Sequence, residues 1–517
     1  MPIKFSAFPF QTKYGVADRT GYDIGGLFAR LTDGEIRCAL YKNCSAIETA
    51  LAGSTDLDLL VSEEDLTKVR GVMTGAGGIR GYPCRYYDNA IPEREDWFVP
   101  TGEGRVLHFD LAHAVMTGPK FHKRYRALEF GDLLPTQVEK VEPEGLLRVT
   151  PAVELQIALL RAAFRINGWI PGRWLRADGD LGRMLGEGFP PGARDHEFTV
   201  DLGMWNIRCA ARRDGSRLFL DRRAMRDIRQ AVRRRHGIGP LVAWRDRAIH
   251  WTRRASFSVM RRITRRVRGR EANKRRLRRG CVVALVGPDG VGKSTQSVRL
   301  REIFGRKFRS TTVYLGSNDG SWMKFRGKLR LARTAHSTVA AAVTNPAPSD
   351  KAPSDKKRNK GERGAFHSVG SAIWRLAVAG NRYLGMRRAL RLAKSGTLVI
   401  TDRCPQNIEE GILDGPSAAP ASRYRLALML WQLEKRLYRA MAGFAPDFTI
   451  HLECDYASSH ARKPGDIDPA DFDRRIALMR TMQERDCNIA VIDARADIDT
   501  VTRQLFALIW QQLLRMA

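Results

Sequence analysis

A glycine-rich stretch that also carries a lysine and two hydroxyl side chains occupies residues 287–295, GPDGVGKST. Its spacing satisfies the pattern G-x-x-x-x-G-K-[ST], in which glycines let backbone N–H groups converge on phosphate oxygens without interference from Cβ atoms. Lys293 is expected to reach the β- and γ-phosphates of ATP, and the Ser294 hydroxyl to coordinate Mg²⁺. The expected nucleotide-binding residues are Gly287, Pro288, Asp289, Gly290, Val291, Gly292, Lys293, Ser294 and Thr295.

The segments on both sides of this loop have the residue types that the motif requires. Residues 282–286 are wholly apolar, as in a central strand of a parallel sheet, and a partly apolar helical pattern follows up to Gly305. Strand-like runs then alternate with helical stretches to residue 517: TTVYLG, TLVITD, DFTIHLE and IAVIDA. This alternation predicts an α/β domain over residues 281–517, with a parallel sheet and helices on both faces.

Residues 345–364 interrupt the alternation with a stretch that is poor in apolar residues and rich in Pro, Ser and Lys. The sequence APSDK occurs in it twice in tandem. Such a segment cannot bury enough apolar surface to offset its ordering entropy, so we expect a disordered insertion. A tail that binds a partner is the alternative.

The loop and the strands resemble those of thymidylate kinases and related nucleoside monophosphate kinases. GPDGVGKST has an acidic residue before its central glycine, TLVITDR matches a strand followed by Asp-Arg, and ARKPGD resembles a short basic lid. The resemblance implies that Asp402 helps to organise the Mg²⁺–phosphate site and that Arg403 contacts the acceptor phosphate. It implies that Arg462 and Lys463 close over the transferred group, and that Asp289 approaches the acceptor's sugar hydroxyls. The expected catalytic residues are therefore Lys293, Asp289, Asp402, Arg403, Arg462 and Lys463.

Two elements depart from the thymidylate kinases. Where those enzymes carry Phe-x-Arg-Glu-Pro, this chain reads VYLGSNDGSW, and Cys404 follows the Asp-Arg pair. The arrangement of YLGS, DRCPQ and DGP is more similar to thymidylate-kinase-like proteins associated with bacterial surface-polysaccharide synthesis. We expect a phosphotransferase that moves phosphate from ATP to a nucleoside monophosphate, dTMP-like, or to a related phosphorylated small molecule. A nucleotide-binding scaffold or regulator of polysaccharide biosynthesis is the alternative.

A second group of acidic residues lies in the first part of the chain. Asp56 and Asp58 alternate in the strand-like run TDLDLLV, and Asp110 ends the later run VLHFD. Alternate residues of a strand point to the same face, so these acids could share divalent ions with the third from a neighbouring strand. Asp56, Asp58 and Asp110 are therefore the expected metal ligands in the first part of the chain. Ser294 and Asp402 are the expected metal ligands beside the glycine-rich loop.

This pattern resembles the nucleotidyltransferase superfamily, which implies that Gly53 and Ser54 cradle phosphate. Here only Thr55 separates that pair from the acids, where the superfamily has a longer spacing. An α+β nucleotidyltransferase-like domain, active or degenerate, is expected over residues 1–150. The alternatives are a simple turn at the Gly-Ser pair and a solvated acidic strand end.

Residues 151–280 begin with an apolar helical pattern and become rich in arginine, so we expect a helical, basic connector there. Residues 212–280 hold 25 basic and 5 acidic side chains, a net charge of +20 out of +32 for the chain. A basic amphipathic helix can lie on an anionic membrane, track a nucleic-acid backbone, or pack as a connector against a domain. An apolar stripe between the arginines would comprise Trp251, Phe257, Val259, Ile263 and Val267.

No run of residues resembles a secretory leader or a membrane span, so a cytoplasmic protein, in contact with the inner membrane surface at most, is expected. The expected partners are a nucleotide and a phosphorylated small-molecule acceptor, with peripheral contact to an anionic membrane through residues 212–280. Nucleic acid is less favoured, because no recognised nucleic-acid module accompanies the basic patch. The oligomeric state stays open, a dimer included.

Overall fold

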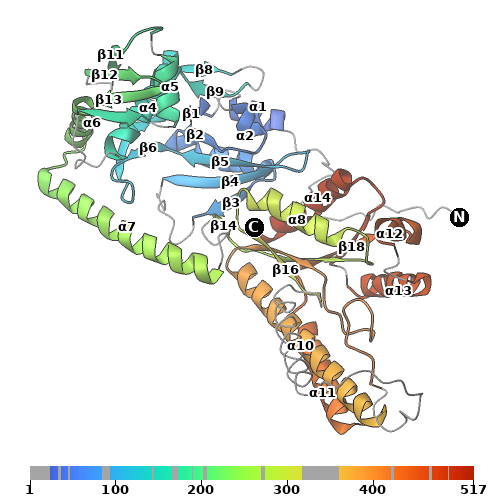
Figure 1. The fold of residues 1–517 in the computed structure, drawn as a ribbon. Coiled ribbons are helices and arrows are strands. Elements are labelled where there is room, and N and C mark those ends of the chain that lie inside the picture. Colours follow the sequence, from blue (N-terminus) through green and yellow to red (C-terminus); the bar gives the residue numbers. More distant parts are fainter. Residues whose placement is uncertain are drawn as a thin grey trace, which may run out of the picture. The chain divides into compact units, whose positions relative to one another are not determined.

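The computed structural model of the chain has two compact units, Met1–Arg275 and Arg276–Ala517 (Figure 1). The structure describes residues 24–32, 36–44, 47–83, 93–141, 145–165, 173–177, 179–188, 190–201, 206–268, 274–316, 360–420, 424–464, 468–486 and 488–517.

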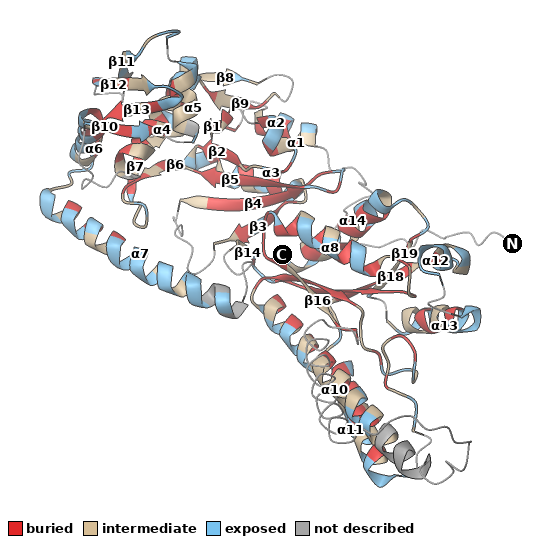
Figure 2. Ribbon diagram, viewed as in Figure 1, coloured by how far each residue is buried: buried red, intermediate tan, exposed pale blue. Residues whose placement is uncertain are grey.

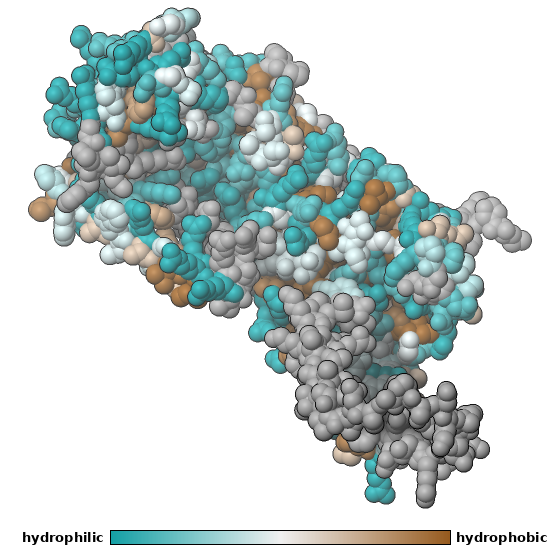
Figure 3. Space-filling view, in the orientation of Figure 1, coloured by the Kyte–Doolittle hydropathy of each residue, from teal (hydrophilic) through white to brown (hydrophobic). Residues whose placement is uncertain are grey.

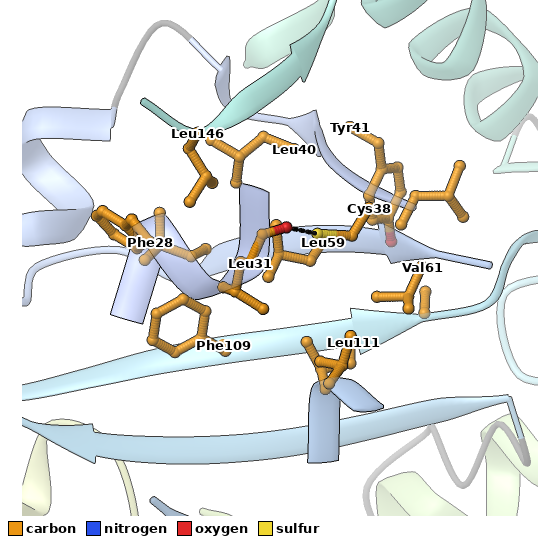
Figure 4. Close-up of a cluster of buried hydrophobic side chains, with 14 of the residues drawn as sticks. Phe28, Leu31, Cys38, Leu40, Tyr41, Leu59, Val61, Phe109, Leu111 and Leu146 are labelled. Atoms are coloured by element: carbon orange, nitrogen blue, oxygen red, sulfur yellow. Dashed lines mark hydrogen bonds between the residues drawn. The ribbon is translucent and has the colours of Figure 1, made fainter. Parts of the chain in front are cut away.

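The first unit is built on a mixed sheet whose parallel neighbours β2 and β5 are buried along their whole length. Its strands, in the order in which they pair, are β3 (Ile79–Tyr82), β4 (Arg94–Pro100), β5 (Val106–Ala112), β2 (Leu57–Val61), β1 (Cys38–Lys42), β9 (Leu147–Val149) and β8 (Val138–Lys140). Three helices accompany it, α1 (Ile24–Thr32), α2 (Ile47–Leu51) and α3 (Leu66–Gly75). Figure 4 shows Phe28 and Leu31 of α1 among Leu59, Phe109 and Leu111 of the sheet, which fixes this helix on the sheet.

A second, antiparallel sheet in the same unit has the strand order β10-β13-β12-β11. Its strands are β10 (Trp174–Ala177), β11 (Asp195–Asp201), β12 (Asn206–Asp214) and β13 (Arg217–Asp221). The unit also contains a hairpin of β6 (Ala114–Thr117) and β7 (Tyr125–Glu129). Its other helices are α4 (Pro151–Arg165), α5 (Asp180–Glu187), α6 (Arg222–Arg235) and α7 (Pro240–Arg268). This sheet packs with α4, α5 and α6 in one hydrophobic core.

The prediction of a helical connector over residues 151–280 is therefore wrong for the strands between 174 and 221. In β12, Ile207, Cys209 and Ala211 are buried, whereas Arg208 between them is exposed. This is the alternation of a half-buried strand. Arginines occupy many of the outward positions of these strands. They make the stretch strongly basic overall, so the alternating apolar residues were not recognised as a strand pattern.

The second unit contains a five-stranded, fully parallel sheet with the order β16-β17-β15-β18-β19. Its strands are β15 (Val282–Val286), β16 (Ser310–Tyr314), β17 (Leu398–Asp402), β18 (Phe448–Glu453) and β19 (Ile489–Asp493), after the short β14 (Arg276–Leu277). Its helices are α8 (Lys293–Gly305), α10 (Lys360–Lys394), α11 (Arg425–Ala442), α12 (Tyr456–Arg462), α13 (Pro469–Arg485) and α14 (Ile498–Met516). Figure 1 shows α8 and α14 on one face and α10 and α13 on the other, so the predicted α/β sheet with two covered faces is confirmed.

Helix α8, which follows the glycine-rich loop, is held by the last helix. Phe304 of α8 stacks on Phe506 of α14 with ring centroids 5.1 Å apart, and Trp510 adds a second stacked ring. Gln296 donates to the Ile498 carbonyl at 3.1 Å and accepts from the Thr502 hydroxyl at 2.8 Å. These contacts fix the helix whose first turn carries Lys293.

The three central strands of the parallel sheet, β15, β17 and β18, are almost completely buried, whereas the edge strands β16 and β19 are mostly half-buried. Figure 2 shows buried residues in red. Among the helices that the structure describes, none is long and apolar enough to cross a membrane. The predicted disordered insertion 345–364 lies outside the described residues up to position 359. Residues 360–364 already belong to α10, so the prediction ends too late.

Candidate nucleotide-binding site

The glycine-rich loop joins β15 to α8 and borders a cavity of about 470 Å³. Two of its glycines have left-handed backbone angles, φ 84° at Gly290 and φ 97° at Gly292, which other residues rarely adopt. A Cβ at Gly290 would also lie 2.7 Å from the Ser459 carbonyl oxygen. The strand before the loop and the helix after it are as predicted. One side of the loop therefore faces the cavity, where a ligand can bind, and another side packs against Ser459 of α12.

The Lys293 ammonium lies inside the loop. Its Nζ donates to the carbonyl oxygens of Gly287 at 2.8 Å and Pro288 at 2.7 Å. Burial, opposed by the charge of Asp289 and aided by that of Arg403, lowers the pKa of Lys293 to about 8. The side chain is charged at neutral pH and is placed to meet an anion in the cavity.

Ser294 and Asp402 form the pair expected to hold Mg²⁺. Asp402 ends β17 and lies in register with Leu285 of β15, so its carboxylate reaches the first turn of α8. The Ser294 hydroxyl donates to Asp402 Oδ2. Asp402 is buried, and its Oδ1 has no hydrogen-bond partner within the part of the chain that the structure describes. An unsatisfied buried carboxylate oxygen beside a hydroxyl fits a hard cation, which prefers oxygen ligands.

Arg403 lies between two carboxylates. One guanidinium nitrogen donates to Asp289 Oδ1 at 2.9 Å, and another lies 3.3 Å from Asp414 Oδ2. Its φ of 82° is unusual for a residue with a side chain and turns it from the end of β17 toward the loop. Burial would lower the pKa of Arg403, but Asp414 and Asp289 raise it above the usual value. The guanidinium is thus held in one orientation at the cavity wall.

Asp289 also accepts a hydrogen bond from Arg475 of α13, at 2.6 Å to Oδ2. Burial alone would raise the pKa of Asp289, yet the charges of Lys293, Arg403 and Arg475 hold it below the usual value. Asp289 is therefore an ionised carboxylate that connects the loop to two separate arginines.

Behind Arg403, a buried arginine holds Asp414. Arg382 of α10 donates to the Asp414 carboxylate, to the Tyr438 hydroxyl, and to the Leu315 carbonyl oxygen at 2.7 Å. Because Asp414 contacts both arginines, α10 and α11 help to position the side chain at the cavity wall.

The predicted lid residues reach the same cavity. Arg462 ends α12 and donates to the Ala494 carbonyl oxygen at 2.9 Å, and Lys463 follows it. The structure thus gathers predicted residues from three separate segments around one cavity, namely Asp289, Lys293, Ser294, Arg403, Arg462 and Lys463. The roles expected for these residues, and for Asp402, stay predictions.

Arg475, Arg382 and Asp414 were not among the predicted site residues. Asp414 stands in the DGP that resembles the polysaccharide-associated proteins, so a signal for it was present. Arg382 and Arg475 lie on helices whose sequences show only ordinary basic residues. Their partners are 32 and 186 positions away, so no local pattern indicates them.

The acids of the first unit each have a basic neighbour. Asp58 lies beside Asp110 in the parallel register of β2 and β5, and Asp56 just precedes β2. Lys42 Nζ lies 2.8 Å from Asp58, Arg94 pairs with Asp110, and His108 Nδ1 lies 2.6 Å from Asp56. Across the described ranges, no three His, Cys, Asp or Glu side chains are placed so that they could hold a metal ion.

The backbone N–H groups of Gly53 and Ser54 are already used. They donate to the carbonyl oxygens of Ala50 at 2.9 Å and Thr49 at 3.0 Å, at the end of α2. The Gly-Ser pair therefore forms a helix-ending turn in this structure, which was the alternative to a phosphate cradle. The two-metal assignment of Asp56, Asp58 and Asp110 stays a prediction.

The loop, the parallel sheet and the cavity define the second unit as an α/β domain of the P-loop class. The uncharacterized ATP-binding protein YghR of Escherichia coli (strain K12) is 30% identical over 228 residues, 43% of this chain and 84% of YghR. The chain belongs to the same family as YghR. The uncharacterized ATP-binding protein YghS of that strain is 28% identical over 225 residues, 43% of this chain and 88% of YghS.

A solved thymidylate kinase from Candida albicans matches 45% of this chain and 91% of its own length, at 15% sequence identity and a TM-score of 0.25. No protein-family model matches the chain.

Proposed function

We propose that the second unit binds ATP with Mg²⁺ at residues 287–295 and transfers the terminal phosphate to an acceptor that is itself phosphorylated. One observation carries the proposal. Among the described residues, four basic side chains, Lys293, Arg403, Arg462 and Lys463, line the cavity beside the loop, against the one carboxylate of Asp289. Several cations around one cavity suit the charge of a nucleoside triphosphate and a second phosphate that must be held together.

We assign a role to each of these residues from the chemistry of phosphoryl transfer, in which catalysis is mainly positioning of the reactants and neutralisation of charge. Lys293 neutralises the β- and γ-phosphates, and Ser294 with Asp402 would hold Mg²⁺. Arg403, fixed by its two carboxylates, contacts the phosphate of the acceptor. Arg462 and Lys463 neutralise the group in transit. Mg²⁺ would supply further charge neutralisation at the phosphate oxygens.

Two further observations support this assignment. The family includes proteins described as ATP-binding. The resemblance of GPDGVGKST, TLVITDR and ARKPGD to thymidylate kinases favours a nucleoside monophosphate, dTMP-like, or a related phosphorylated small molecule as the acceptor. Nucleotide and acceptor are then the small-molecule partners of this unit.

The test is ADP release from Mg²⁺ and ATP in the presence of a panel of nucleoside monophosphates and sugar phosphates. We expect one class of acceptor to stimulate release, and Lys293→Ala to lower turnover by at least about a hundredfold. Lys394→Ala, at an exposed position at the end of α10, is the matched control and should keep full turnover. Tight ATP binding that no acceptor converts into turnover would instead identify a nucleotide-binding scaffold or regulator in polysaccharide biosynthesis.

For the first unit, we propose nucleotidyl transfer at Asp58 and Asp110, which lie side by side on β2 and β5. Because the described residues form no group of three that could hold a metal ion, divalent metal at Asp56, Asp58 and Asp110 stays a prediction. The supporting observation is a separate cavity of about 530 Å³ whose lining includes Lys42, the partner of Asp58, together with Arg161. Its apolar wall and basic side chains suit a phosphorylated ligand. The measurement is transfer of a nucleotidyl group from α-labelled ATP, and Mn²⁺ binding by the same protein.

Asp58→Asn should abolish both the transfer and the Mn²⁺ binding, whereas Glu64→Gln, at an exposed position of the same unit, should leave them intact. Mn²⁺ binding that survives Asp58→Asn would mean that this unit carries no two-metal site.

A further inference from the structure

Helix α7 has one face that is fixed to the rest of the first unit. The fully buried Asp246 accepts a hydrogen bond from the Tyr125 hydroxyl and lies 3.3 Å from the Arg124 guanidinium. His250 Nδ1 accepts from the Phe121 backbone N–H at 3.1 Å, and the rings of Phe257 and Phe121 are 5.9 Å apart. These contacts to the β6–β7 hairpin determine which side of α7 faces away.

The side that faces away carries large apolar residues. Five of them are between about half and four-fifths exposed: Leu241 (84%), Trp244 (70%), Trp251 (48%), Val259 (57%) and Ile263 (49%). Their spacings of three, seven, eight and four residues put them on one face of a helix with 3.6 residues per turn. We call these five residues the apolar stripe. In Figure 2, α7 shows mostly exposed residues along its length, and in Figure 3 brown atoms alternate with teal at its place.

This stripe differs from the one expected from the sequence. Phe257 belongs to the packed face, because it contacts Phe121. The side chain of Val267 lies outside the described residues. Leu241 and Trp244, which were not predicted, extend the stripe toward the start of the helix.

Arginines flank the apolar stripe. Helix α7 contains nine arginines and a single acidic residue, Asp246, which is buried in the packed face. The exposed ones include Arg247, Arg262 and Arg266. The Arg254 guanidinium stacks over the Trp251 ring at 4.8 Å, so a cation and an indole are presented together. The exposed surface is thus both apolar and strongly positive.

We propose that this face of α7 binds a bilayer surface that carries anionic lipid headgroups, with the helix lying in the plane of the interface. The apolar stripe would enter the boundary between headgroups and acyl chains, where tryptophan rings are favoured, and the arginines would meet the phosphates. A nucleic-acid backbone would satisfy the arginines but would leave five large apolar side chains in water. The positive charge of the arginines therefore favours an anionic partner, and the exposed apolar stripe favours a lipid surface over a nucleic acid.

The test is sedimentation of the full chain with vesicles of equal parts phosphatidylglycerol and phosphatidylcholine, and with vesicles of phosphatidylcholine alone. We expect binding to the anionic vesicles that weakens with salt. The double variant Trp244→Ser, Trp251→Ser should bind at least about tenfold more weakly, because two apolar side chains no longer leave water. The double variant Arg247→Gln, Arg262→Gln should lose about fivefold per arginine.

Leu134→Ser is the matched control, since Leu134 is an exposed leucine of the same unit outside α7, and it should bind as the unmodified chain does. All variants should keep the same ATP affinity and the same thermal unfolding, because the changed side chains lie on the surface. Equal binding to neutral vesicles, or unchanged binding of the tryptophan variant, would overturn the proposal. It would also be overturned by a chain that ignores vesicles but loses dimerisation or DNA binding in the same variants.

Discussion

The Arg475 guanidinium donates to the Asp289 carboxylate at 2.6 Å, so helix α13 is bonded directly to the phosphate-binding loop. The neighbouring Arg474 points elsewhere and pairs with Glu409. Two consecutive arginines of one helix therefore have different partners, and this difference gives a matched pair of variants.

Arg475→Gln should raise the KM for the acceptor about tenfold, because Asp289 loses a charge-assisted hydrogen bond that orients it toward the cavity. The affinity for ATP should change much less, since Lys293 is held by loop carbonyls that do not involve Arg475. Steady-state kinetics with each substrate varied in turn separates the two effects. Arg474→Gln should leave both constants unchanged, and equal losses in the two variants would contradict an orienting role.

The affinity for ATP should fall as the pH rises through about 8, the lowered pKa of Lys293 in the folded protein. Below that pH the ammonium is charged and attracts phosphate, and above it the neutral amine does not. Calorimetric titration between about pH 7 and pH 9 should show a loss that approaches tenfold per pH unit. In Lys293→Arg the side chain stays charged, so this pH dependence should disappear even if binding is weaker. A slope that is the same in both proteins would assign the titration to another group.

Asp402→Asn should raise the Mg²⁺ concentration needed for half-maximal turnover by about tenfold, because a neutral amide is a poorer ligand for a hard cation. ATP binding without Mg²⁺ should not weaken, since the substitution removes a negative charge near the phosphates. Turnover measured across a Mg²⁺ series gives the comparison, with Ser294→Ala as a second change in the same pair. An unaltered Mg²⁺ requirement in both variants would show that the cation is held elsewhere.

Arg382→Ala should lower the free energy of unfolding of the second unit by about 3–5 kcal/mol, because it removes a buried guanidinium and leaves the half-buried Asp414 carboxylate with one arginine, Arg403, instead of two. Urea unfolding followed by circular dichroism measures this loss. Arg388→Ala removes an exposed arginine of the same helix and should cost less than about 0.5 kcal/mol. A similar small loss for both would mean that the buried network does not stabilise the fold.

The stability of the second unit should decrease between pH 6.5 and about 4 because of His451. This residue is fully buried on β18, and neither ring nitrogen has a hydrogen-bond partner among the residues that the structure describes. Burial lowers the pKa of His451 from 6.5 to about 4. As the pH falls through this window the unfolded chain takes up a proton and the folded chain does not, so stability is lost.

His451→Leu should remove this contribution and flatten the pH profile of unfolding, measured in urea at a series of pH values. His460→Leu, at an exposed position on α12, should keep the original slope. If the two variants titrate alike, the acid sensitivity comes from other groups.

The local geometry of the glycine-rich loop could be predicted because it depends on consecutive residues. Gly290 and Gly292 need left-handed backbone angles, Lys293 and Ser294 must begin a helix, and Asp402 must end a strand. Each requirement leaves a local pattern. The arginines that bond Asp414 and Asp289 could not be predicted in the same way, because Arg382 and Arg475 are ordinary helical residues until folding brings these carboxylates to them.

The same contrast applies to the first unit. The alternation of Asp56 and Asp58 predicted that both lie on a strand, and β2 begins directly after Asp56, so Asp58 lies on it and Asp56 does not. The antiparallel sheet between 174 and 221 was missed, because arginines at outward strand positions give a composition typical of a basic helix. Burial of Ile207 and Cys209 depends on α4 and α6, which a short window of sequence does not include.

The packing of α8 on α14 has a consequence for how the chain acquires its activity. Gln296 and Ile498 are hydrogen-bonded although they are 202 positions apart. On the ribosome, the phosphate-binding loop is made long before the rings of Phe506 and Trp510 exist to hold its helix. Non-local contacts of this kind form late. A nascent chain should therefore carry a complete loop sequence that cannot yet retain nucleotide, and tight binding should begin only when the last helix has left the exit tunnel.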